Sequence, residues 1–265
     1  MLQFGLLPLI LLLGSDDAAP ASSPPATDVA QDDAAAADDA GPKWKGGLHF
    51  GVNYTEGNSD TLNVNLLGDL GLETDKGRTA SSVFWNFGEA DNESNTVRQR
   101  TVDNYGGFAQ YDYFLSGPMF ALANGSFRVD DIAMLDLRYI LGLGLGYQLH
   151  SSDEFKWGLE GGFSYVDERF ATAGSDTDFA AIRIGSKLDW LATKTTRFEQ
   201  IGEVLPSIED SEDFVMSWDN RLKVDMTDSW VLQLQYVYVY DNTPAAGQKR
   251  ADQKLIFSLG WTFGS

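Results

Sequence analysis

The side chains that could do chemistry in this sequence are charged residues that recur at every second or fourth position. Arg183 and Lys187 follow this spacing, and so do Arg221 and Lys223. Residues two apart lie on the same face of a β-strand, so each pair would present its charges on one surface. Such a basic strip, facing carboxylates on other strands, could guide an anion or a sugar acid along a pore. The alternative is that these charges pair into ladders that satisfy one another and partly close the interior.

The sequence offers little else for catalysis. It holds no cysteine and only two histidines, His49 and His150, so thiol nucleophiles, thiolate metal sites and disulfides are excluded. His49 falls on the polar face of an expected strand and is interpreted as a lining residue, because no serine partner for a catalytic triad can be identified. His150 falls in an expected turn. We therefore expect no enzyme activity, no cofactor and no metal site.

The overall charge narrows the range of partners. The chain of 265 residues carries 39 acidic and 19 basic residues, for a net charge of −20. Nucleic acids bind basic surfaces, so we expect no nucleic-acid partner. The sequence leaves the oligomeric state open.

After Trp44, apolar residues alternate with polar or small ones at a period of two, which predicts β-strands. The longest example runs from Leu135 to Leu149, with leucines and tyrosines on one face and Asp136, Arg138 and glycines on the other. At about 3.3 Å per residue this segment reaches about 46 Å, enough to cross a bilayer at a tilt. Its length favours a membrane barrel over a soluble sandwich.

The same alternation continues to the end of the chain. It is clear in eight segments and weaker in four others, 81–88, 97–115, 119–129 and 195–204. Together they predict an all-β protein, a transmembrane up-and-down antiparallel β-barrel of about twelve strands over residues 44–265. Ten or fourteen strands are the alternatives, because 81–88 and 119–129 are poorly bounded.

Two further features indicate that the apolar face of the barrel meets lipid. Aromatic residues cluster at strand ends, as in the girdles of membrane barrels; examples are Trp44, Trp157, Trp190, Trp230 and Trp261. If the N-terminus is periplasmic, connections after even-numbered strands are short and several after odd-numbered strands are long, as in outer-membrane barrels. The alternative is a secreted soluble β-barrel binding protein, whose apolar face would turn inward.

The segment before the barrel has a different composition. Residues 1–21 predict a secretory signal peptide, because an apolar block at 6–13 is followed by small residues. Residues 22–43, rich in alanine, aspartate and proline, predict a disordered acidic linker. We therefore expect a protein of the outer membrane of a Gram-negative-type bacterium, with both termini periplasmic. Its expected partners are outer-membrane lipid, the barrel-insertion machinery and periplasmic chaperones.

Several short motifs carry a family resemblance. They are Gly-Asn-Ser-Asp-Thr at 57–61, the glycine-rich run at 139–147, Tyr-Asp-Asn-Thr-Pro at 240–244 and Trp-Thr-Phe at 261–263. On these motifs the chain resembles the YdiY-like family of salt-induced outer membrane proteins, which is built around domain of unknown function 481. The resemblance implies an envelope protein and carries over no catalytic residue.

The alternation also assigns charged side chains to the barrel interior. The predicted lining consists of Arg138, Lys156, Glu160, Arg183, Lys187, Asp189, Glu203, Asp219, Arg221 and Lys223. The same parity places Arg98, Arg100 and Asp136 inside. This lining predicts a narrow passive channel for ions or small polar solutes. The alternative within the membrane is a non-conducting structural or salt- and envelope-stress barrel whose lumen is plugged.

Overall fold

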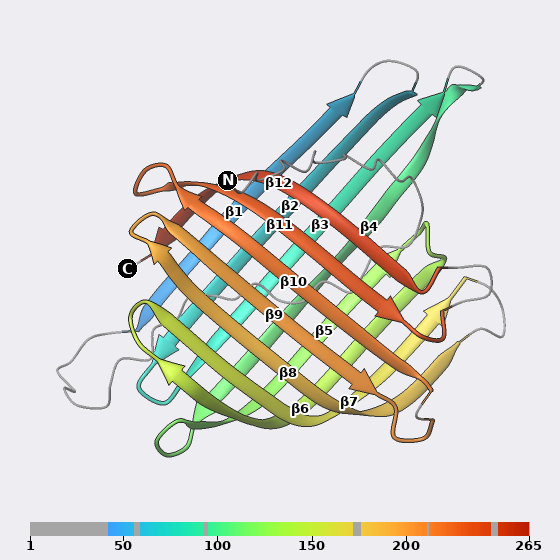
Figure 1. The fold of residues 1–265 in the computed structure, drawn as a ribbon. Helices are drawn as coiled ribbons and strands as arrows, with labels where there is room; N and C mark the ends of the chain where they lie inside the picture. Colours follow the sequence, from blue (N-terminus) through green and yellow to red (C-terminus); the bar gives the residue numbers. More distant parts are fainter. Residues whose placement is uncertain are drawn as a thin grey trace, which may run out of the picture.

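The chain folds into a closed antiparallel β-barrel, which confirms the predicted architecture (Figure 1). The computed structural model describes residues 42–55, 59–92, 95–171, 176–210, 212–244 and 249–264. Each strand pairs with its neighbours in sequence, and β1 pairs with β12 to close the ring. The predicted signal peptide, 1–21, and nearly all of the predicted linker, 22–43, lie outside the described residues.

The described residues form twelve strands, the number that the alternation predicts. They are β1 (Lys43–Thr55), β2 (Ser59–Thr74), β3 (Gly77–Asn92), β4 (Asn95–Phe114), β5 (Met119–Asp130), β6 (Leu135–Ser151), β7 (Phe155–Phe170), β8 (Thr177–Thr193), β9 (Thr196–Pro206), β10 (Phe214–Asp225), β11 (Trp230–Asp241) and β12 (Ala251–Gly264). None of the described residues forms a helix long and apolar enough to cross a membrane.

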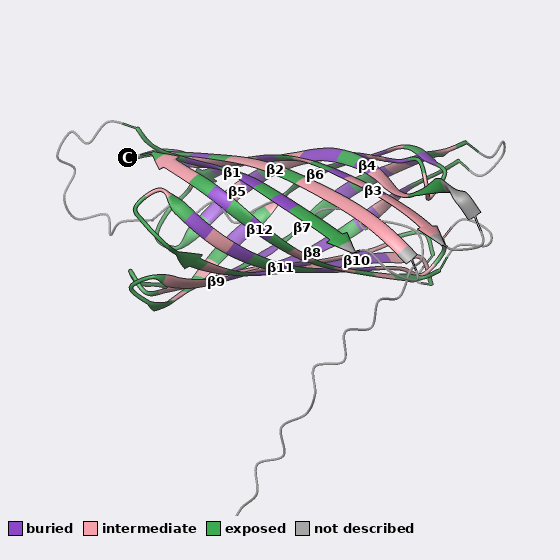
Figure 2. Cartoon of the chain, turned by 90° about the horizontal axis from the view of Figure 1, so that it is seen from above, coloured by how far each residue is buried: buried purple, intermediate pink, exposed green. Residues whose placement is uncertain are grey.

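The strands expose their apolar side chains on the outside of the barrel. In β6, Leu141, Leu143 and Leu145 are all exposed, whereas the glycines between them face inward. Exposed and buried residues alternate along most strands (Figure 2). Period-two patterning thus places the large apolar residues on the surface and the polar ones inside, the reverse of a soluble barrel.

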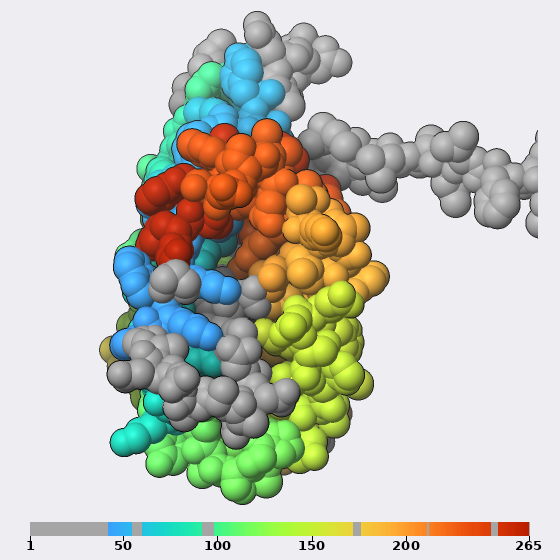
Figure 3. Space-filling model, turned by 90° about the vertical axis from the view of Figure 1, so that its left-hand side faces the viewer, coloured from blue at the N-terminus to red at the C-terminus, as the bar shows by residue number. Residues whose placement is uncertain are grey.

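The two rims of the barrel differ in their connections. The N-terminal end of β1 pairs with the C-terminal end of β12, so the first strand begins and the last strand ends at one rim, here called the terminal rim. Its turns are short and comprise residues 75–76, 115–118, 152–154, 194–195 and 226–229. The opposite rim, here called the loop rim, holds the longer connections 171–176, 207–213 and 242–250. Seen from the terminal rim, the ring of strand ends has an elongated outline (Figure 3).

Three of the interior assignments are wrong. A register shift between Leu135 and Leu137 turns Asp136 outward and Leu135 inward, so the predicted inward position of Asp136 is wrong. A second irregularity, between Gly88 and Glu89, lies near the end of β3 and the start of β4. Beyond it the side chains of Arg98 and Arg100 are about half exposed, not enclosed. An inserted residue reverses parity, and the alternation of a single strand does not reveal it.

Candidate functional site

The interior of the barrel is lined by charged side chains that are buried from solvent. Of the ten predicted lining residues, five are buried: Arg138, Glu160, Arg183, Asp219 and Arg221. The other five are half-buried: Lys156, Lys187, Asp189, Glu203 and Lys223. Buried charges are costly unless they are paired and hydrogen-bonded, so the contacts of each group decide what the interior can do.

Glu160 of β7 is the centre of the first group. Its Oε2 accepts a hydrogen bond of 2.7 Å from Arg183 Nη1, and its Oε1 lies 2.8 Å from Lys187 Nζ. Gln110 Nε2 donates to the same Oε1 over 3.1 Å, although β4 and β7 are not neighbours. Arg183 Nε donates in turn to Glu203 Oε2 at 2.6 Å. Two cations and two carboxylates thus form one network across β7, β8 and β9.

The second group lies on β9, β10 and β11. Asp219 accepts hydrogen bonds from Arg221 Nε at 3.2 Å and Arg221 Nη2 at 2.5 Å, and Gln235 Nε2 donates to both carboxylate oxygens. Lys223 Nζ donates to Glu199 Oε1 at 2.7 Å. Since each of these cations has a carboxylate partner, the basic strip predicted from the sequence is a set of ion pairs.

The third group lies near the loop rim and crosses the barrel. Arg138 of β6 forms an ion pair with Glu168 on the neighbouring strand β7. Its Nη2 also donates to Asp241 Oδ2 on β11, at 3.2 Å. Four strands, β7 to β10, separate β6 from β11 in the ring. Side chains from opposite walls therefore meet in the interior.

Lys156 and Asp189 complete the predicted lining. They lie opposite each other in the register of β7 and β8, close to the terminal rim. Asp189 also accepts two hydrogen bonds from Arg197 Nη1, at 3.0 and 2.8 Å. The lining thus extends from one rim to the other.

Apolar side chains also occupy part of the interior, which the alternation did not indicate. Ile140, Val166, Phe179, Ala181 and Leu205 form a buried cluster on β6 to β9. These residues sit among charged ones on inward positions, so no regular pattern identifies them. They narrow the interior on that wall.

The glycines of β6 do not leave open space. A Cβ atom at Gly146 would overlap the ring of Phe120, and one at Gly142 would overlap Asn124 Oδ1. Both neighbours project inward from β5. The small residues of one strand therefore make room for larger ones on the next.

His49 lies in the interior, as its strand parity predicts. Its Nε2 lies 3.2 Å from Asp69 Oδ1, and Gly260 leaves room for its ring. The hydroxyl of Ser258 is buried nearby on the next strand, but no hydrogen bond joins it to the imidazole within the described barrel. A nucleophilic triad needs that bond. His150 is exposed and its ring lies tilted against that of Phe155, with centroids 5.5 Å apart.

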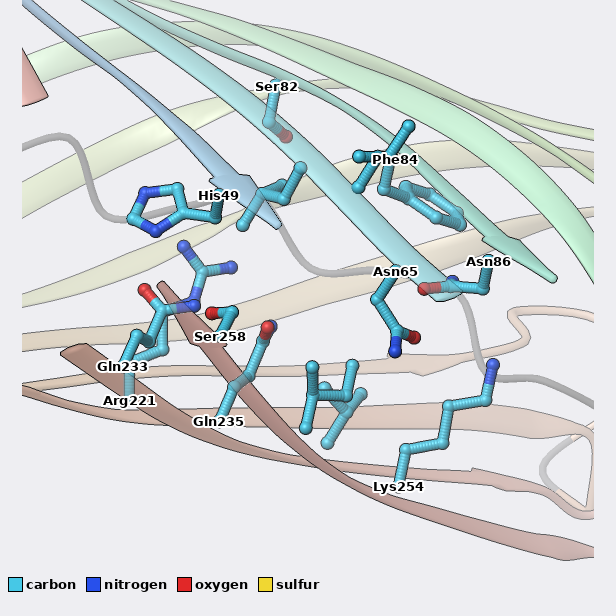
Figure 4. Close-up of a pocket in the computed structure, with 14 residues that line it drawn as sticks. His49, Asn65, Ser82, Phe84, Asn86, Arg221, Gln233, Gln235, Lys254 and Ser258 are labelled. Atoms are coloured by element: carbon cyan, nitrogen blue, oxygen red, sulfur yellow. The ribbon is translucent and has the colours of Figure 1, made fainter. Parts of the chain in front are cut away.

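The barrel has one notable hollow in its interior and another on its outer face. One, of about 50 Å³, lies inside the barrel against β10, β11, β12, β1, β2 and β3 (Figure 4). The other lies on the outer face, where Gly68, Gly107 and Gly125 stand between larger apolar side chains such as Leu141. Among the described residues, no group of three or more histidine or acidic side chains is placed to hold a metal ion.

An apolar outside around a charged inside defines a β-barrel of the membrane-protein class. The chain belongs to the family described as "Protein of unknown function, DUF481", which matches residues 48–263. This membership confirms the resemblance drawn from the sequence motifs. A comparison with curated proteins finds no relative.

Solved structures of similar shape are outer-membrane barrels of low identity. The NanC porin is 12% identical, with a TM-score of 0.49 over 84% of this chain and 98% of that one. The translocator domain of the autotransporter NalP from Neisseria meningitidis is 11% identical, with a TM-score of 0.43 over 86% and 89%. The COG4313 outer membrane channel from Pseudomonas putida F1 is 13% identical, with a TM-score of 0.44 over 84% and 95%. With TM-scores below 0.5, these likenesses do not determine what this protein does.

Proposed function

We propose that this protein is an outer-membrane barrel whose charged interior is a narrow passage for ions and small polar solutes. The observation that carries the proposal is the sidedness of the barrel. Leu143 and Phe163 are about two-thirds exposed on the outside, whereas Glu160 and Arg183 are buried inside. A secreted soluble barrel would place the large apolar residues inward, so sidedness favours the membrane over that alternative.

The dimensions of the strands support this placement. The shortest strand, β9, has 11 residues. At about 3.3 Å per residue and a tilt of about 45° it covers about 26 Å, close to the apolar band of outer-membrane barrels. Exposed tryptophans mark the terminal rim, at Trp44, Trp157, Trp190, Trp230 and Trp261. A belt of this kind suits the boundary between lipid and water.

The orientation follows from the two rims. Outer-membrane barrels keep short turns in the periplasm and longer loops outside. The terminal rim has the short turns, so we place both chain ends in the periplasm and the loop rim outside. Insertion would then require periplasmic chaperones and the barrel-insertion machinery. No residue of the described interior is assembled for catalysis, and the proposal assigns the protein no enzyme activity.

Planar-bilayer conductance tests the passage. Single-channel steps are recorded for the wild type and for a double variant, Lys187→Ala with Arg221→Ala. Removing two interior cations lowers the local concentration of anions, so the reversal potential should move toward cation selectivity. A matched double variant on exposed residues, Arg169→Ala with Lys194→Ala, removes the same charge outside the interior and should leave selectivity unchanged. The absence of reproducible steps from folded wild-type protein would refute the passage.

A non-conducting structural barrel is the second candidate. The contact of Arg138 with Asp241 and the interior cluster around Phe179 favour it, because both fill the lumen. Heat-modifiable migration of the membrane fraction on a denaturing gel establishes the folded barrel in either case. Conductance then separates the two candidates. Recovery of the protein in a soluble periplasmic fraction would contradict both.

A further inference from the structure

The cavity inside the barrel is lined by residues that hold buried polar atoms without a partner in the described structure. They are His49 Nδ1, Arg221 Nη1, Gln233 Oε1 and Ser258 Oγ. Their residues are 5%, 2%, 1% and 4% exposed, respectively. Leaving a buried polar atom unsatisfied costs free energy, so four of them around one cavity indicate a site that takes a polar ligand or ordered water.

Asp219 fixes the way in which Arg221 faces this cavity. It holds Nε and Nη2 of the guanidinium, and Gln235 holds both oxygens of Asp219 from the other side. The third guanidinium nitrogen, Nη1, has no hydrogen-bond partner in the described structure. In Figure 4 the guanidinium points toward His49, with Gln233 and Ser258 beside it. A positioned N–H group is thereby presented at one end of the cavity.

Lys254 supplies a second cation at the other end. In Figure 4 its side chain extends toward Asn65 and Asn86. No hydrogen bond or ion pair joins its amine to another residue of the described barrel. The ionisable residues that line the cavity are His49, Arg221 and Lys254, and no carboxylate lines it. Their carboxylate partners, Asp69 beside His49, Asp219 beside Arg221, and Asp130 and Asp252 near Lys254, lie outside the lining, so the cavity itself presents N–H donors and no carboxylate.

The neutral lining groups narrow the ligand further. The hydroxyl of Ser258 can donate or accept, while Gln233 presents a carbonyl oxygen that accepts. A ligand that satisfies them needs both acceptor oxygens and an O–H group. The cavity of about 50 Å³ limits it to a few heavy atoms. Asn65, Ser82, Asn86 and Gln235 add further polar groups to the lining, and Phe84 and Ile256 add apolar contact.

We infer that this cavity binds a small protonated oxyanion, of the chemistry of hydrogen phosphate. Arg221 and Ser258 donate to its oxygens, Gln233 accepts from its O–H group, and Lys254 adds a positive charge at the other end of the cavity. The inference deepens the proposed function by naming the solute class of the interior, and it rests on that proposal only for a route of access. Binding itself can be measured apart from conduction.

Inorganic phosphate is the probe, added to the folded full-length protein in detergent at constant ionic strength set with sodium chloride. Calorimetric titration or ³¹P line broadening measures the dissociation constant. Lys254→Gln should raise this constant about 10-fold or more, because a positive charge near the anion is lost. Ser258→Ala should raise it about 2- to 10-fold, as expected for one neutral hydrogen bond.

Ser164→Ala is the matched control for Ser258→Ala. Ser164 is equally buried, at 5%, faces the interior from β7 and also has an unpartnered hydroxyl, but it does not line the cavity. The Ser164→Ala variant should leave the dissociation constant for phosphate unchanged. Heat-modifiable migration shows that each variant is folded. Absence of phosphate binding, or equal weakening by both serine variants, overturns the inference and identifies the cavity as a water site.

The two proposals fail separately. If the barrel conducts but does not bind phosphate, the oxyanion site is refuted and the passage stands. The opposite result is also possible. If phosphate binds, Lys254→Gln and Ser258→Ala weaken the binding, Ser164→Ala does not, and the barrel gives no conductance, then the passage is refuted and the oxyanion site stands.

Discussion

Arg138 and Asp241 join opposite walls of the barrel. Arg138 Nη2 donates to Asp241 Oδ2 over 3.2 Å, from β6 to β11. Glu168 holds the same guanidinium from the neighbouring strand. A contact between walls that are separated by four strands must narrow the interior near the loop rim. It is therefore the place where a single substitution should widen the passage.

Asp241→Ala should increase single-channel conductance, by about twofold or more if this contact is the narrowest point. Arg138 keeps Glu168 as its partner, so the variant removes the crossing contact without leaving an isolated cation. Planar-bilayer recordings at fixed salt measure the effect. Asp225→Ala is the charge-matched control, because Asp225 is exposed at the terminal end of β10. Equal conductance in the wild type and in Asp241→Ala would show that the lumen is limited elsewhere.

Much of this barrel could be predicted from the sequence, because each strand carries its own signal. Alternation from Leu137 to Leu149 states which side chains face lipid, and it does so without knowledge of any other strand. Twelve such segments and short turns on one rim imply an up-and-down barrel. The charged positions on the inward face follow from the same parity, which is why Glu160, Arg183 and Arg221 could be assigned.

The partners of those charges could not be predicted. Arg138 meets Asp241 only because strands β6 and β11 face each other across an elongated ring, and alternation contains no information on the shape of the ring. A bulge likewise leaves no signal in the alternation, as the outward position of Asp136 shows. On β11, Val231, Val237 and Val239 are inward while tyrosines and leucines are outward. Gln233, Gln235 and Asp241 share the inward face with these valines, so on this strand only half of the inward positions carry the polar signal.

Glu160→Gln should destabilise the folded barrel by about 3 kcal/mol, because Arg183 and Lys187 lose a buried counter-charge. The amide has nearly the same shape, so the effect reports charge rather than packing. Urea unfolding followed by tryptophan fluorescence measures it. Glu154→Gln, on an exposed turn residue, should change stability by less than about 0.5 kcal/mol.

The same variant makes a second, independent test of the ion-pair network. Loss of one interior negative charge should move selectivity toward anions, opposite to the Lys187 and Arg221 double variant. An unchanged unfolding midpoint together with unchanged selectivity would contradict the role given to Glu160.

Gly146→Ala should destabilise the barrel by about 1–3 kcal/mol through overpacking. A Cβ at this position overlaps the ring of Phe120, which also lies 5.0 Å from the guanidinium carbon of Arg78. The double variant Gly146→Ala with Phe120→Leu should recover part of the loss, because the smaller side chain vacates the space. Additive destabilisation in this cycle would mean that the two residues do not share the space.

Leu143→Arg tests which side of the barrel meets lipid. Leu143 is 68% exposed in the middle of β6, where the proposal places it against acyl chains. An arginine at the mid-plane of a bilayer costs about 2–4 kcal/mol in a membrane barrel. Urea titration of the protein folded into lipid vesicles should therefore show a loss of that size. Leu143→Ala removes the same side chain without adding charge and separates the charge effect from lost contact area. In a soluble barrel an exposed leucine faces water, and arginine there would change stability by less than about 0.5 kcal/mol. An unchanged free energy of unfolding for Leu143→Arg in vesicles would refute the assignment of this position to the lipid-facing side of the barrel.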